Sequence, residues 1–182
     1  DWTALSSEEG RGGLRVGRIK TAYGLYNTTR DVPFTRPSIL LPQSIYFERT
    51  RNLTVSADGA ELYIERYGEA GTLSASFAYG QPQTDTDAAK IALVGLHRPG
   101  SLDSKMAPDF QVIYEGSGGR YRLGFTALRL DLKYQPGYGD ILQAGRFKLT
   151  PLIFSAQYHA ENWSLTSEYA RRRTSVEDFG PY

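Results

Sequence analysis

Apolar and polar residues alternate in several stretches of the chain. In the clearest N-terminal example, residues 60–66 and 72–79 alternate on either side of a turn at residues 67–71. Leu62 and Ile64 carry the apolar positions of the first stretch, and Leu73, Ala75 and Phe77 carry those of the second. A period of two is typical of a β-strand with one apolar face. The pattern therefore predicts an antiparallel hairpin.

A second hairpin is predicted near the C-terminus, where residues 152–159 and 163–169 alternate across a turn at Glu161-Asn162. Further strands are predicted at residues 14–21, 110–115, 120–134 and 141–149, which gives about eight in all. The apolar phase changes at Ala127-Leu128, which predicts a β-bulge there.

Two all-β architectures fit these strands, a transmembrane β-barrel and a soluble β-sandwich, since both have one apolar face. Strands of about 9 to 15 residues are longer than those of most globular sheets. Aromatic residues also lie beside the predicted turns, as in the aromatic girdles of membrane barrels. These aromatics are Tyr79, Tyr114, Tyr134, Tyr158 and Trp163. In the barrel interpretation the lipid-facing residues include Leu73, Ala75, Phe77, Leu152, Phe154, Trp163 and Leu165.

The composition argues against several kinds of chemistry. The chain has no cysteine and a net charge of +1, which predicts neither thiolate catalysis nor general attraction to nucleic acid. His97 and His159 are the two histidines, too few for a histidine metal triad. Glu61 and Glu65 share a strand face, but at about 13 Å apart they exceed the separation of paired glycosidase carboxylates. We therefore expect no enzyme, no catalytic residue, no metal and no cofactor.

Residues 22–56 break the alternation and predict a long loop after the first strand. The segment contains Pro33, Pro37 and Pro42, and loops of this length are uncommon unless they serve a function. It is also basic, since residues 15–51 carry a local charge of about +5. The basic side chains that we select as candidates are Arg18, Lys20, Arg30, Arg36, Arg49 and Arg51.

Several motifs resemble the porin-like outer-membrane proteins of Gram-negative bacteria, with the phosphate-selective porin O/P-like branch nearest. They are VGRIKTAYGL at residues 16–25, TRD at 29–31, FTR at 34–36, PSILLPQSIYF at 37–47 and WSLTSEYA at 163–170. The resemblance implies an antiparallel transmembrane β-barrel whose loop 22–56 folds inward as a constriction. The six basic residues would then line the pore, of which Arg18, Lys20, Arg30 and Arg36 fall within the similar motifs. The branch's specific anion site is not carried over, because the repeated basic ladder is missing.

The expected function is an outer-membrane porin, a passive diffusion channel for small hydrophilic solutes, anions among them, located in the cell outer membrane. Its partners would be outer-membrane lipid, lipopolysaccharide and those solutes, and a homotrimer is compatible with the resemblance. The chain, residues 1–182, would be a single barrel domain truncated at both ends, because porins need about 16 to 18 strands. The alternative is a soluble or surface β-sandwich that serves as a binding or adhesion module.

Overall fold

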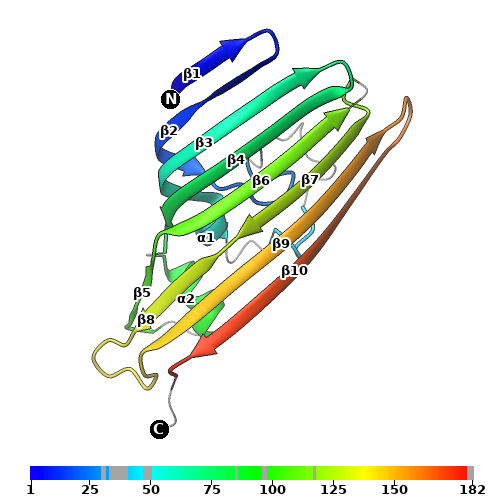
Figure 1. Cartoon of the computed structure of the whole chain (residues 1–182). Helices are drawn as coiled ribbons and strands as arrows, with labels where there is room; N and C mark the ends of the chain where they lie inside the picture. Colours follow the sequence, from blue (N-terminus) through cyan, green and yellow to red (C-terminus); the bar gives the residue numbers. More distant parts are fainter. Residues whose placement is uncertain are drawn as a thin grey trace.

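The computed structural model describes residues 1–29, 32, 41–46, 51–84, 86–95, 98–116 and 118–179, without the side chains of residues 51 and 52. It is a single curved antiparallel sheet with two short helices (Figure 1). The strands are β1 (Trp2–Ser7), β2 (Gly10–Lys20), β3 (Ser56–Gly68), β4 (Gly71–Pro82), β5 (Ser101–Ser104), β6 (Ala107–Gly116), β7 (Tyr121–Leu128), β8 (Leu130–Gln135), β9 (Gly145–His159) and β10 (Ser164–Glu177). The helices are α1 (Arg51–Val55) and α2 (Asp87–Val94). The predicted all-β antiparallel class is confirmed.

The ten strands form an up-and-down meander. The pairing order is β1-β2-β3-β4-β6-β7-β9-β8-β5, and β10 pairs with the other side of β9. β7 and β8 pair with β9 in one continuous register, since Ala127 lies opposite Leu152 and Leu130 lies opposite Leu149. β5 pairs with β8, and β6 pairs with β7, so β5 and β6 together lie along the interrupted strand formed by β7 and β8. The sheet therefore behaves as about eight long strands, two of them interrupted.

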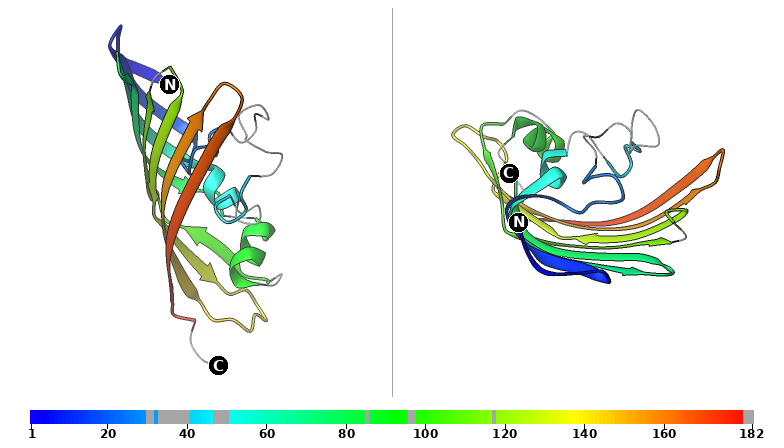
Figure 2. Two further views of the ribbon diagram at one scale, coloured as in Figure 1. Left: turned by 90° about the vertical axis from the view of Figure 1, so that its right-hand side faces the viewer. Right: turned by 90° about the horizontal axis from the view of Figure 1, so that it is seen from above.

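The described sheet is not closed into a barrel. β1 forms one edge and β10 the other, and neither pairs with the other within the described residues. Figure 2 shows the strong curvature of the sheet, with the helices and the segment after β2 on its concave side. Curvature of one sign over so many strands is the consequence of strand twist and coiling.

The predicted bulge at Ala127-Leu128 is wrong. The register between β7, β8 and β9 runs through that point without an extra residue. The irregularity lies on the neighbouring strand, where one extra residue stands between Lys105, which bonds to Asp131, and Pro108, which bonds to Arg129. From Leu128 onward the apolar residues lie on the concave face of the sheet, because Leu128 and Leu130 are buried there under the helices.

Two predicted strands, 141–149 and 152–159, are one strand. β9 runs through Pro151, which pairs with Arg172 of β10. On the other side of β9 the ladder is interrupted between Ala127 and Leu130, opposite Pro151 and Thr150. Proline has no N–H to donate, so it is tolerated at this gap. β1, β5 and both helices were not predicted.

The buried core lies on the concave side and joins three layers of the chain. The sheet supplies Leu128, Leu130, Leu132, Tyr134, Phe147 and Ile153, the helices supply Leu53 and Ala89, and the segment after β2 supplies Leu25, Tyr26, Leu41, Ile45 and Tyr46. Helix α2 is capped at its start by the Thr86 hydroxyl and at its end by Gly95 in the left-handed conformation. This core fixes the loop and the helices to one face of the sheet.

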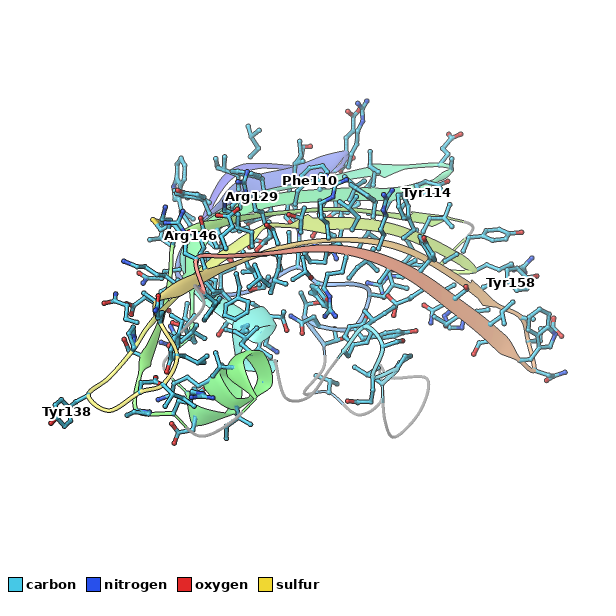
Figure 3. All side chains as sticks on the ribbon, turned by 90° about the horizontal axis from the view of Figure 1, so that it is seen from below. Phe110, Tyr114, Arg129, Tyr138, Arg146 and Tyr158 are labelled. Atoms are coloured by element: carbon cyan, nitrogen blue, oxygen red, sulfur yellow. The ribbon has the colours of Figure 1, made fainter. Side chains whose placement is uncertain are left out.

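The convex face is apolar and exposed. Phe77 is 46% exposed and Phe154 is 53% exposed, although large apolar side chains are usually buried. Phe110 and Tyr114 lie on this face, away from the helices (Figure 3). By strand alternation the same face includes Trp2, Leu14, Val16, Leu62, Ile64, Leu73, Leu123, Leu152, Leu165 and Tyr169. The predicted outward set from Leu73 to Leu165 thus shares one face, with Trp163 beside Tyr158.

Candidate functional site

The segment after β2 packs against the concave face of the sheet. Leu25 is only 1% exposed, and its side chain lies over Gly124 of β7. A side chain at position 124 would crowd Leu25, so the glycine makes room for it. Tyr26 and Tyr46 are equally buried and meet edge to face, with ring centroids 6.1 Å apart. Residues 22–29 and 41–46 are thus docked on the sheet, and together they are called the docked segment or docked loop.

Glu168 of β10 is the main polar anchor of this segment. One of its carboxylate oxygens accepts hydrogen bonds from the Leu25 backbone N–H at 3.0 Å, the Tyr46 hydroxyl at 2.9 Å and the Ser155 hydroxyl at 2.8 Å. Burial raises the pKa of Tyr46 far above its ordinary value, and the negative charge of Glu168 raises it further. Tyr46 therefore stays protonated and remains a donor to the carboxylate.

Two glutamines and an asparagine complete the attachment. Gln111 donates to the carbonyl of Gly24 at 2.9 Å, and Gln157 donates to the Tyr26 hydroxyl at 3.0 Å. Asn27 closes the base of the segment, because its amide donates to the carbonyls of both Thr21 and Thr54. Inward-facing polar residues of the strands therefore satisfy the backbone of a loop that would otherwise bury unpaired groups.

Gly24 provides a matched test of this docking. Gly24 has φ of +62° and Gly118 has φ of +66°, but an added Cβ would overlap the Tyr46 hydroxyl only at position 24 and meets nothing at position 118. We expect Gly24→Ala to destabilise the protein by about 2 kcal/mol or more and Gly118→Ala by only about 1 kcal/mol. Denaturant titration measures both, and equal losses would contradict the tight fit at Gly24.

The charged residues of the concave face are largely paired with one another. Arg15 contacts the buried carboxylate of Glu61 at 2.9 Å and lies over the ring of Tyr63. Arg11 makes a two-pronged contact with Glu65 at 2.8 and 3.0 Å. Arg122 lies 3.9 Å from Glu115. These cross-strand pairs offset each other's charge and contribute little net field to the concave side.

Two of the six predicted basic residues are described with their side chains. Arg18 lies on the convex face, where it pairs with Asp58 at 2.9 and 3.1 Å; it therefore does not join the charges of the concave side. Lys20 ends β2 and donates to the carbonyl of Thr28 in the docked segment, at 3.0 Å. Arg30, Arg36 and Arg49 lie outside the described residues, and only the backbone of Arg51 is described, in α1.

The residues that hold the loop were not predicted from the sequence. Glu168, Gln111, Gln157 and Asn27 were not selected, although Glu168 lies within the motif at residues 163–170. The available signal was their position, because a charged or amide side chain at the inward phase of a long strand needs a polar partner inside. Which backbone groups would meet them depends on contacts across more than eighty residues.

Neither helix in the described part of the chain has the length and apolar character needed to cross a membrane. Within the same residues, no group of three or more metal-ligating side chains could hold a metal ion. Comparison of the chain with family models, with curated proteins and with solved structures finds no match.

Proposed function

We propose that this chain forms part of the wall of an outer-membrane pore of the porin kind, with the convex face toward lipid and the concave face toward the lumen. The observation that carries the proposal is the distribution of polarity. The exposed convex face is apolar and aromatic, whereas the concave face carries ion pairs, amides and a docked loop. Membrane barrels have this arrangement, with apolar residues outside and polar residues inside.

The connections support the same proposal. At one end of the sheet, the links between β1 and β2, β3 and β4, β6 and β7, and β9 and β10 are short. At the other end, the links from β2 to β3, from β4 to β5 and from β8 to β9 are much longer (Figure 1). Outer-membrane barrels have short periplasmic turns and longer extracellular loops. The end with α1 and α2 would then face outward from the cell.

A row of charged residues borders the apolar band on the convex face toward the end with long loops. Arg129 and Arg146 lie on this side (Figure 3), and Arg146, Lys105 and Lys148 make ion pairs with Asp131 or Glu177. Charged side chains next to an apolar band suit the boundary with lipid headgroups. In the proposed orientation they would meet the phosphates of lipopolysaccharide.

The competing proposal is a soluble or surface β-sandwich that serves as a binding or adhesion module. A sandwich buries the apolar face of one sheet against the apolar face of another. Here the loop and helices cover the concave face instead, and the described residues leave the apolar convex face bare. Detergent fractionation separates the two functions, because a pore protein should require detergent and show heat-modifiable migration on a gel. A protein that stays soluble without detergent would exclude the pore.

Ion selectivity tests the role of the basic loop. We expect Arg30→Glu combined with Arg36→Glu to shift the zero-current potential in a salt gradient toward cation preference. Residues 22–56 carry a net charge of about +2, and positive charge at a constriction focuses the field and attracts anions. The shift should shrink as salt rises toward 1 M, where the Debye length is about 3 Å.

The control is Arg129→Glu, which changes charge on the convex face. It should leave the potential unchanged, because a charge outside the wall acts only weakly on ions inside it. An unchanged potential in the double variant at low salt would place those arginines outside the conduction path.

A further inference from the structure

A cavity of about 470 Å³ lies between the concave face of β8, β9 and β10 and the layer formed by the docked loop, α1 and α2. Its volume falls within the range of about 300 to 1,000 Å³ that is usual for small-molecule sites. Figure 2 shows that the helices and the docked segment lie over this part of the sheet. Arg18 and Lys20, the two candidates described with their side chains, do not line it.

The wall of the cavity changes from polar to apolar across three strands. On the edge strand β10, the polar residues Arg172 and Thr174 line it, followed by Val176. Arg172 and Thr174 lie opposite Pro151 and Leu149 of β9, and Leu149 lies opposite Leu130 of β8. Phe147 extends the apolar part along β9. A ligand in the cavity would therefore meet charge at one side and hydrocarbon at the other.

Arg172 differs from the other arginines of the concave face. Arg11, Arg15 and Arg122 each have a carboxylate partner, whereas within the described residues Arg172 has none. Its charge acts on Tyr23, which also lines the cavity: burial raises the pKa of the Tyr23 hydroxyl, and the positive charge of Arg172 opposes that rise. The guanidinium and the hydroxyl thus line the same cavity.

We propose that this cavity binds a small monocarboxylate with a hydrocarbon body, such as an aromatic acid, with the carboxylate on Arg172 and the hydrocarbon against Leu130, Phe147 and Leu149. The planar guanidinium matches a carboxylate in a two-pronged contact. One cation beside a mostly apolar wall suits a single negative charge and would leave a phosphate dianion poorly compensated. The inference rests on the proposed function only for the route by which the acid arrives.

Benzoate is the probe, with benzamide as its uncharged isostere and inorganic phosphate as a purely polar anion. Binding is measured by calorimetry on the purified protein in detergent. We expect benzoate to bind more tightly than either comparator, and Arg172→Gln to weaken it by about tenfold or more. Leu93→Trp, which fills the cavity from α2, should also block benzoate.

The matched control is Arg171→Gln, because Arg171 is the neighbouring residue on β10 and points to the convex face. Its benzoate affinity should equal that of the unmodified protein. Equal affinity for benzoate and benzamide, or equal loss in the two arginine variants, would overturn the proposal.

Binding and conduction are separate readouts. Benzoate bound by a protein that forms no pore would support the site and refute the porin function. A protein that forms a pore but binds no benzoate would support the porin function and refute the site.

Discussion

Phe77→Lys is expected to prevent stable insertion of the protein into lipid bilayers. Phe77 lies within the apolar band of β4 and opposite Phe110 of β6, on the convex face. A lysine on the lipid face near the bilayer midplane costs about 2–4 kcal/mol. The lysine would also lie beside an aromatic row, because Phe110, Phe125 and Phe154 continue the band across β6, β7 and β9.

The measurement is the fraction of protein that folds into lipid vesicles, followed by heat-modifiable migration. Ser74→Lys is the matched control, because Ser74 lies on the same strand but faces the concave side, opposite Glu65 and Ile113. It should insert nearly as well as the unmodified protein. If Phe77→Lys instead yields a well-folded protein with higher solubility in the absence of detergent, the convex face contacts water or a protein, and the pore proposal fails.

Glu168→Ala is expected to release the docked segment from the concave face. The substitution removes the common acceptor of Leu25, Tyr46 and Ser155. Three donors would lose their partner, at a cost of about 3 kcal/mol or more for hydrogen bonds to a charged group. In Glu168→Gln the amide oxygen still accepts, so the loss should be about half as large.

Limited proteolysis with chymotrypsin reports the release, because Tyr23 and Tyr26 are buried in the docked state. Cleavage at these tyrosines should become much faster in Glu168→Ala, and the conductance of the pore should rise if the segment narrows it. Glu161→Ala, in the turn between β9 and β10, removes an exposed carboxylate and should change neither the cleavage rate nor the conductance. Unchanged cleavage in Glu168→Ala would mean that the apolar contacts of Leu25 and Tyr26 hold the segment without the carboxylate.

Local alternation in the sequence was enough to place most of the long strands and to assign their faces. Hairpins at residues 60–79 and 152–169 were predicted from alternation, and both exist as the ends of longer hairpins. Alternation also determined that Leu73, Phe77, Leu152, Phe154 and Leu165 share a face. The physical reason is local, since successive side chains of a strand point to opposite sides whatever the rest of the chain does. The loss of alternation at residues 22–56 could be seen in the sequence for the same reason.

The choice of the concave face, and the segments that pack on it, depend on contacts between distant parts of the chain. Alternation cannot show that apolar residues move to the inner face after Leu128, because this change depends on the helices packed below β8 and β9. It cannot show that Arg18 pairs with Asp58 on the convex face. Nor can it show that Arg172, beside a cavity, has no carboxylate partner among the residues that the structure describes. The partners of Glu168 lie in the docked segment and across the β9–β10 ladder. Contacts between residues so distant in sequence are set by the curvature and register of the whole sheet, which no local pattern encodes.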